Sequence, residues 1–506
     1  MKAWIDLFII VYFVVLNSFY GLLILLSLLE VARRKSDRLP ELDSEILRHG
    51  TAPPVTVIAP AYNEQETIVD SVRALLDVEY PDFEVVVVND GSRDQTLETL
   101  REAFDLEPAD RVVHRRIETE PVKTIYRSEH DDRLVVADKV NGGKGDALNV
   151  GINLARSPLV CCIDADTIVE RTALLRMIEP YVYHPLDVMA VGGTVRVANG
   201  CAVGETGIEE MRLPDSWLAR FQIVEYLRAF LFGRMGFNRL GGNLIISGAF
   251  GLFLKEAVVD VGGYDDETVG EDMELIVRLH KHGRSTEPPR RVIQIPEPIS
   301  YTEVPEDFRT LGVQRDRWHR GLADSLWRHK TMFLNPRYGA IGMFVVPVYF
   351  FFELIGPLVE LFGYGWFLVS ILFGFVDWNF AAVFLLVAFF WGALLSIHSL
   401  LLDNWSFKIF RGGESGGKLA LAAILENLGY RQTTLLYRLR GLIKFLLGMG
   451  DWGEMNRDGF DEASESEEAE GRSELAPAGP GGGAPANVAE AEGETAEAED
   501  DRTETS

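Results

Sequence analysis

Residues Leu159 to Glu170 read LVCCIDADTIVE, and this stretch decides the fold. Five apolar residues end at Ile163 and are followed at once by Asp164 and Asp166. A continuous apolar run of this length is typical of a strand buried on both faces of a parallel sheet. The two aspartates then lie at the carboxyl edge of that strand, where open α/β sheets bind their ligands. Such a pair can share one divalent cation with phosphate oxygens, or it can simply shape a turn or cap a helix.

The sequence on both sides of this stretch alternates short apolar runs with amphipathic segments. Strands are expected at 55–59, 83–88 and 187–197, and helices at 64–76, 94–104 and 144–155. We expect a charged, irregular section at 107–133. The order of these elements predicts an α/β fold with a doubly wound, mostly parallel sheet and right-handed crossovers.

Charge and cysteine content narrow the class of protein. The 506 residues carry a net charge of −27, and residues 461–506, with 15 acidic and 2 basic residues, contribute −13 of it. An acidic chain does not follow a nucleic-acid backbone, so we exclude nucleic acid as a partner. The three cysteines have no paired spacing, which predicts reduced thiols, and adjacent Cys161 and Cys162 are expected to pack in the core.

The N-terminal region predicts a membrane anchor. Residues 7–29 are nearly all apolar, and about 20 such residues cross a bilayer. The basic cluster Arg33-Arg34-Lys35 follows, which by the positive-inside rule places this end in the cytosol. A signal peptide is the alternative, but a basic cluster, rather than a small-residue cleavage site, follows the apolar run.

Further apolar segments follow the α/β region. Residues 214–233 and 307–333 predict helices that lie in the headgroup plane, and for 214–233 a core helix fits almost equally well. Residues 341–402 contain only three charged residues and can hold two or three spans, while 418–430 and 435–449 fit a further span or interfacial helices. Composition alone predicts a disordered acidic tail after residue 459. The predicted parts are 1–32 (anchor), 53–305 (catalytic domain), 306–338 (interfacial helix), 339–403 (transmembrane helices), 404–458 (transmembrane or interfacial helices) and 459–506 (tail).

Four polar clusters fall after predicted strands or at helix starts. They are Asn89-Asp90-Gly91-Ser92, Asn141-Gly142-Gly143-Lys144-Gly145-Asp146, Asp164-Ala165-Asp166 and Gly270-Glu271-Asp272. Each has a structural alternative, because Asx turns and helix caps use the same residues. The glycine-rich loop lacks Walker A spacing, so ATP hydrolysis is not indicated, but its amides and lysine could approach a diphosphate.

Taken together, the motifs resemble those of the membrane-embedded family 2 glycosyltransferases, the group with cellulose, chitin, hyaluronan and poly-N-acetylglucosamine synthases. The resemblance covers 53–337 and is strongest to the poly-β-1,6-N-acetylglucosamine synthase-like branch. The matching residues, in the family's order, are Ala59-Pro60-Ala61-Tyr62-Asn63-Glu64, Asn89-Asp90-Gly91-Ser92, Gly143-Lys144-Gly145-Asp146-Ala147-Leu148-Asn149, Asp164-x-Asp166, Glu271-Asp272 and the Q-x-x-R-W signature Gln314-Arg315-Asp316-Arg317-Trp318.

The resemblance implies a GT-A-like domain with interfacial helices and a transmembrane bundle, and it implies roles for single residues. The nucleotide-sugar pocket would comprise Ala61, Tyr62, Asn63, Glu64, Asp90, Lys144, Asp164 and Asp166. Asp166, with Asp164, would hold Mg²⁺ or Mn²⁺. Asp272 would be the general base that gives inversion, and the catalytic group would also include Glu271, Gln314, Arg317 and Trp318. The acceptor would contact Ser247, Gly248 and Trp318.

Two positions depart from the family pattern. Asn89 stands where many members have a second aspartate, and Gly270 stands where many have threonine. Neither position carries an assigned chemical role. We expect Gly270 to loosen the helix start that positions Asp272.

Three functions fit these patterns. The leading one is a processive β-glycan synthase that uses a UDP-sugar, with UDP-GlcNAc favoured, and passes its product through its own helices. The second is a glycolipid-forming glycosyltransferase with a lipid acceptor, and the third is a non-enzymatic membrane subunit. The expected partners are a UDP-sugar donor, a glycan or lipid acceptor and the lipid bilayer, with room for a small membrane accessory subunit. We expect an integral membrane protein of a bacterial-type inner or plasma membrane with a cytoplasmic catalytic domain.

Overall fold

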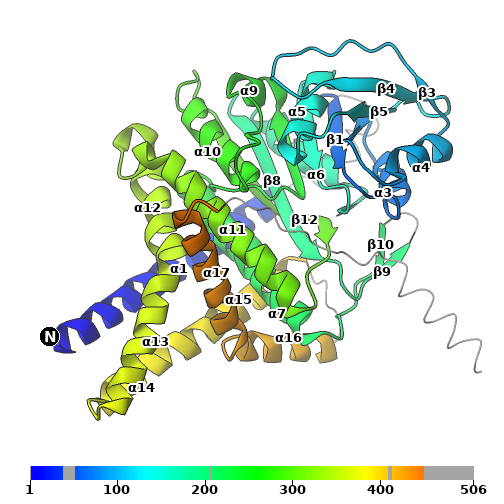
Figure 1. Cartoon of the computed structure of the whole chain (residues 1–506). Helices are drawn as coiled ribbons and strands as arrows, with labels where there is room; N and C mark the ends of the chain where they lie inside the picture. The colour runs from blue at the N-terminus through cyan, green and yellow to red at the C-terminus, as the bar shows by residue number, and fades with distance from the viewer. Residues whose placement is uncertain (1, 38–51, 205–206, 408–412, 450–506) are drawn as a thin grey trace, which may run out of the picture. The chain divides into compact units, whose positions relative to one another are not determined.

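The computed structural model describes residues 2–37, 52–204, 207–407 and 413–449, all within the first of two units, 1–457 and 458–506 (Figure 1). A ten-stranded sheet has the order β3-β4-β5-β2-β1-β6-β11-β8-β12-β7. Its strands are β1 (Val55–Ala61), β2 (Phe83–Asn89), β3 (Leu106–Pro108), β4 (Val122–Ser128), β5 (Leu134–Lys139), β6 (Leu159–Ile163), β7 (Ile168–Val169), β8 (Val188–Val197), β11 (Phe250–Leu254) and β12 (Arg291–Thr302). A separate hairpin pairs β9 (Ala202–Gly204) with β10 (Gly207–Glu210).

The centre of the sheet is parallel. Strands β5, β2, β1 and β6 are adjacent and parallel, whereas β11 pairs antiparallel with both β6 and β8. The β6 strand is buried along its whole length, as its apolar run predicts. Its alternate residues enter two different cores, so Cys161 and Cys162 face opposite sides of the sheet as free thiols. The predicted α/β fold with a mostly parallel sheet is confirmed.

Helices cover both faces of the sheet. Apolar residues of α3 (Ile68–Leu76), α4 (Thr96–Ala103) and α6 (Ala173–Tyr183) belong to one core. Those of α5 (Lys144–Leu154), α9 (Lys255–Asp260) and α10 (Glu271–Gly283) belong to the other. Helices α5 and α10 therefore lie on the same face of the sheet, so the residues at their starts, Lys144 and Glu271, can lie close together.

The prediction for 107–133 was wrong in part. This section contains β3 and β4, and the next strand, β5, was also missed. Strand β4 is an antiparallel strand near the sheet edge with several partly exposed residues, so charged side chains interrupt its apolar pattern. Strand β5 is fully buried, yet it ends in Asp138-Lys139, two charged residues that hide a strand signal.

The remaining helices lie at the N-terminus, between β10 and β11, and after β12. They are α1 (Lys2–Asp37), α7 (Trp217–Leu227), the π-helix η1 (Arg228–Arg234), α8 (Met235–Arg239), α11 (Phe308–Arg328), η2 (Lys330–Met332), η3 (Pro336–Tyr338), η4 (Ile341–Val345), α12 (Val346–Val348), η5 (Tyr349–Leu354), α13 (Gly356–Leu372), α14 (Trp378–Leu385), η6 (Leu386–Phe390), α15 (Trp391–Ser406), α16 (Gly413–Leu425) and α17 (Tyr430–Leu446). Within the described residues, two helical stretches, 2–36 and 341–372, are long and apolar enough to cross a membrane by length and composition.

The N-terminal helix is joined to the α/β domain by ion pairs. Arg34 reaches Glu179 of α6 at 2.6 Å and Glu297 of β12 at 2.8 Å, and both glutamates are buried. Glu30 pairs with Arg239 of α8 at 2.6 Å. Close packing supports these pairs, because a Cβ on Gly236 would meet the Leu23 carbonyl oxygen at 2.8 Å. Helix α1, drawn in dark blue, is therefore a built-in part of the unit (Figure 1).

The two amphipathic helices have different surroundings. Most of α7 is buried, and it packs against β8, α15 and α16, which matches the core-helix alternative for 214–233. Helix α11 packs along α17 and touches α10. The predicted acidic tail lies entirely outside the described residues.

Candidate active site

Strand order brings the predicted motifs to one edge of the sheet. The parallel strands β1, β2 and β6 end at Ala61, Asn89 and Ile163, so the residues that follow them share the carboxyl edge. Strand β11 runs the other way, and its first residue, Phe250, pairs with Ile163. The segment before β11 therefore also lies at this edge, and it contains Ser247 and Gly248.

A charged cluster stands at the centre of this edge. The ammonium nitrogen of Lys144, at the start of α5, lies 2.5 Å from Asp164 Oδ1 and 3.7 Å from Glu271 Oε1. A Cβ placed on Gly248 would lie 3.0 Å from that nitrogen and 3.9 Å from Asp272 Oδ2. Five predicted residues, spread over 129 positions of sequence, thus meet in one place. We name Lys144, Asp164, Glu271 and Asp272 the edge cluster.

The cluster's charges perturb one another. Burial lowers the pKa of Lys144, but Asp164 and Glu271 outweigh it, so the net shift is upward and the group stays an ammonium ion. Burial raises the pKa of Glu271, and Asp272 raises it further, while Lys144 and Arg317 oppose the rise. Lys144 therefore balances a surplus of negative charge at the sheet edge.

The start of α10 is fixed by a close helix contact. A Cβ on Gly270 would lie 2.7 Å from the Cα of Gly321 in α11, closer than two carbons can approach. The expectation of a loose helix start is corrected here, because the missing side chain lets two backbones pack in direct contact. Asp272 accepts a hydrogen bond from the Met273 amide at 2.7 Å, which orients its carboxylate further.

The signature helix α11 contributes to the same neighbourhood. Arg317 lies one turn before Gly321 on the same face of α11 and is close enough to influence the pKa of Glu271. Trp318 is 44% exposed, so part of this residue is accessible to a ligand. Gln314 accepts a hydrogen bond from Arg315 at 2.8 Å and is thus turned toward its own helix.

Asp90 has a buried position under the glycine-rich loop. Its carboxylate accepts hydrogen bonds from the amides of Gly142 at 3.0 Å and Gly143 at 2.8 Å, and from the Asn141 side chain at 3.2 Å. Burial raises the pKa of Asp90, and Lys139, at 2.5 Å, partly offsets that rise. The observed contacts make Asp90 the anchor of the loop that opens α5, and its place in a nucleotide-sugar pocket stays a prediction.

Sequence reasoning missed Lys139. Its side chain is fully buried, and it bridges Asp90 and Asp146, each at 2.5 Å. It thereby joins the ends of β2 and β5 to the first turn of α5. The signal was hidden because Lys139 ends a strand that the sequence did not reveal.

The segment after β1 is joined to the segment after β2. The Asn63 side-chain oxygen accepts a hydrogen bond from the Arg93 backbone amide at 2.9 Å, and the Asn63 backbone amide donates to the Ser92 hydroxyl at 3.0 Å. Asn63 adopts a positive φ of 57°, which asparagine tolerates better than most residues. The amide of Glu64 donates to Thr96 at 2.8 Å. Tyr62 is 42% exposed, and Ala61 is buried, so of these two only Tyr62 has substantial exposed surface for a ligand.

The donor set fits a cation shared with a phosphate ligand. No group of three or more His, Cys, Asp or Glu side chains suited to a metal occurs within the part of the chain that the structure describes. Asp164 and Asp166 leave the end of β6 two residues apart, and Asp164 already pairs with the cationic Lys144. Hard divalent ions take carboxylate, phosphate and water oxygens, so a cation here would need diphosphate oxygens to complete its shell.

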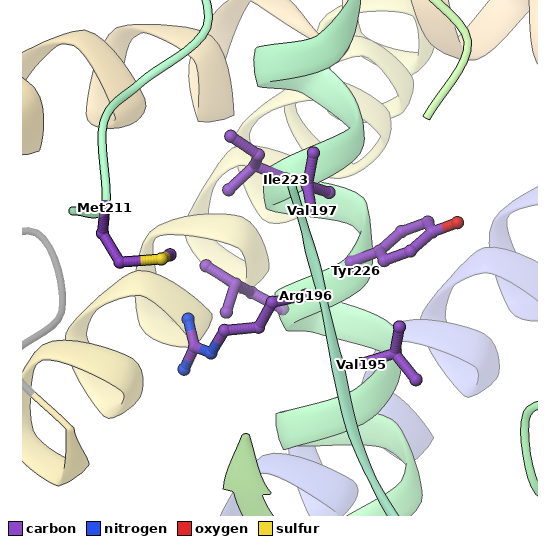
Figure 2. A pocket seen from close by; sticks show the side chains of 7 residues that line it. Val195, Arg196, Val197, Met211, Ile223 and Tyr226 are labelled. Atoms are coloured by element: carbon purple, nitrogen blue, oxygen red, sulfur yellow. The ribbon is translucent and has the colours of Figure 1, made fainter. Parts of the chain in front are cut away.

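A small hollow elsewhere is unrelated to this edge. It lies between β8 and α7 and is lined by Val195, Arg196, Val197, Met211, Ile223, Tyr226 and Leu227 (Figure 2). None of the predicted site residues lines it. Arg196 pairs with Asp403 of α15, so the hollow borders a joint between the sheet and a helix.

A mostly parallel α/β sheet with carboxylates and an ammonium group at its carboxyl edge agrees with what the motif resemblance implies for a GT-A-like glycosyltransferase domain. Residues 56–262 match the model described as glycosyl transferase family 2, so this part of the chain is a family 2 glycosyltransferase domain. The resemblance seen in the motifs is thereby confirmed.

The chain is similar to synthases of bacterial polysaccharides. It is 32% identical over 275 residues to the poly-beta-1,6-N-acetyl-D-glucosamine synthase of Staphylococcus aureus (strain COL) and 30% identical over 274 residues to that of Staphylococcus epidermidis. Each alignment covers 54% of this chain and 56% of the relative, so the chain spans about half the length of the curated relatives it matches. Among solved structures, the mannosyltransferase PcManGT from Pyrobaculum calidifontis in complex with GDP-Man and Mn²⁺ aligns with a TM-score of 0.49 at 18% identity, over 84% of this chain and 99% of that chain.

Proposed function

We propose that this protein is a metal-dependent inverting glycosyltransferase that adds sugar from a UDP-sugar to a growing β-linked polysaccharide and passes the product across a membrane. The edge cluster carries the proposal, because it combines a cationic group that can attract a diphosphate with a carboxylate that can accept a proton. UDP-GlcNAc is the favoured donor, since the similar curated synthases are named for a polymer of N-acetylglucosamine.

In the proposed reaction an acceptor hydroxyl oxygen attacks the anomeric carbon as the bond from that carbon to the diphosphate oxygen breaks. Asp272 takes the hydroxyl proton as general base. Attack from the face opposite the leaving group inverts the anomeric centre, so an α-linked donor yields a β-linkage. Lys144 and Arg317 hold the negative charge of the departing UDP. A bound Mg²⁺ or Mn²⁺ held by Asp166 and Asp164 would supply further neutralisation of that charge.

The membrane part of the proposal has independent support. Helices 2–36 and 341–372 are long and apolar enough to span a bilayer. The ion pairs of Arg34 join the basic end of α1 to the α/β domain, so the domain lies at the end that the positive-inside rule assigns to the cytoplasm. We therefore propose an integral membrane protein with a cytoplasmic catalytic domain.

The test uses the whole chain in detergent or nanodiscs with Mg²⁺ and UDP-GlcNAc, UDP-Glc, UDP-GlcA or UDP-Gal in turn. We expect UDP release and a long product with one donor. Removal of the base in Asp272→Asn should cut the rate at least about a hundredfold while UDP binding persists. Transfer of a single residue would refute processivity, and activity only with added diacylglycerol, ceramide or polyprenyl phosphate would favour the glycolipid alternative. Full activity of Asp272→Asn would refute the base assignment.

A further inference from the structure

Arg315, a variable position inside the Q-x-x-R-W signature, contacts two of the signature's fixed residues. Its guanidinium carbon lies 4.2 Å from the centre of the Trp318 ring, and its Nη1 donates to Gln314 Oε1 at 2.8 Å. The Arg315 side chain is almost fully buried. Trp318 itself is partly exposed, so Arg315 connects a buried charged group to a residue that a ligand can reach.

Arg315 is itself held from two other helices. Its Nη2 donates to Glu225 of α7 at 2.8 Å and to the hydroxyl of Tyr430, the first residue of α17, at 3.4 Å. The Tyr430 hydroxyl in turn donates to the same Glu225 oxygen at 2.5 Å. The Tyr430 ring also packs on Phe221 with ring centres 5.4 Å apart. We name Arg315, Glu225 and Tyr430 the arginine clamp.

The chemistry of the arginine clamp suits a role in orienting the Trp318 ring. A guanidinium group can stack on an aromatic face while its edge donates to a carboxylate, whereas a lysine ammonium cannot do both. The Glu225 carboxylate accepts a hydrogen bond from the same guanidinium group that packs over the Trp318 ring, so Glu225 is linked to that ring through Arg315. A sugar ring stacks on an indole only when the indole plane is held in the right orientation.

We propose that the arginine clamp positions Trp318 and Gln314 for binding of the acceptor glycan, so that α7 and α17 set the geometry of the acceptor site. This inference rests on the proposed function, because it takes Trp318 to be the surface on which an acceptor sugar lies. The three residues act through Trp318 and are positioning residues.

The test compares Tyr430→Phe with Tyr181→Phe. Tyr430→Phe removes one hydroxyl of the clamp and keeps the ring packing. Tyr181→Phe is the control, because it removes a buried tyrosine hydroxyl outside the clamp, which donates to the Leu252 carbonyl. Binding of a short oligomer of the donor sugar is measured by titration without donor, and UDP binding, thermal midpoint and product length are measured in parallel. Arg315→Lys, which keeps the charge and loses the planar stack, is the second clamp variant.

We expect Tyr430→Phe to weaken oligomer binding about fivefold and to shorten the product, with UDP affinity unchanged within about twofold. Arg315→Lys should weaken oligomer binding more, and Tyr181→Phe should leave both ligands at wild-type affinity. If both clamp variants bind the oligomer with wild-type affinity, this inference is overturned and the proposed function is not. Equal losses of UDP and oligomer affinity would show a general structural role and also overturn it. A wild-type protein that binds no oligomer and releases no UDP would refute both this inference and the proposed function.

Discussion

Replacing Lys144 by methionine should change the affinities for nucleotide and for divalent cation in opposite directions. The substitution keeps the length and apolar stem of the side chain and removes its ammonium group. In the structure this group lies 2.5 Å from Asp164 and 3.7 Å from Glu271. A divalent ion that binds Asp164 must displace the Lys144 ammonium group from this carboxylate. The diphosphate of a nucleotide, in contrast, is attracted to the same ammonium group.

The structure sets the size of the effect. Two unit charges about 2.5 Å apart attract by roughly 7 kcal/mol at an effective dielectric constant of about 20. Lys144 and Asp164 are each about a quarter exposed, so solvent screening and desolvation reduce this greatly, and a net value of about 1.4 kcal/mol is reasonable. That energy corresponds to about a tenfold change in a dissociation constant.

The assay measures each ligand without the other. Binding of Mn²⁺ without nucleotide, followed by electron paramagnetic resonance, should be about tenfold tighter in Lys144→Met. Binding of UDP without metal, followed by calorimetry, should be about tenfold weaker. Lys123→Met is the control, because Lys123 pairs with Asp138 at 3.2 Å outside the edge cluster. Unchanged or weaker Mn²⁺ binding in Lys144→Met would refute the idea that the lysine and the cation compete for Asp164.

Three further outcomes are expected. In Gly270→Ala the new methyl group would meet the Gly321 backbone, so this variant should be less stable by about 1–3 kcal/mol and transfer sugar more slowly. Gly365→Ala, at an open helical position, is the control and should keep wild-type stability. Denaturation in detergent measures the stability of both variants. Arg34→Met leaves two buried glutamates without their cation and should cost about 3–5 kcal/mol, visible as a large drop in thermal midpoint. Burial raises the pKa of Glu274, but hydrogen bonds from His329 and Arg278 outweigh burial and hold this pKa below the ordinary value of 4.5. The ionised Glu274 therefore stabilises the folded protein above pH 4.5, and this stabilisation is lost as the pH falls through the lower pKa of the folded state. Glu274→Gln should make the thermal midpoint less sensitive to acid.

Local patterns in the sequence predicted the elements that lie in the middle of the sheet. An apolar run such as Leu159–Ile163 is typical of a strand buried on both faces, and the polar residues after it mark the end of that strand. The helix starts at Lys144 and Glu271 also followed from local signals. Strands β4 and β5 escaped because exposed positions and terminal charges break the periodicity that a sequence reading relies on.

By itself, the sequence determined the fold class, the family of the domain at 56–262 and the residues that gather at the carboxyl edge, because strand burial and motif order depend on residues that are close in sequence. Only the tertiary structure decided which groups neutralise one another there. Lys139 between Asp90 and Asp146, Gly270 against Gly321, and Arg315 between Glu225 and Trp318 are pairings across chain segments whose positions depend on how the helices pack. Charge balance and backbone contact depend on distances in space, and a linear pattern does not contain those distances.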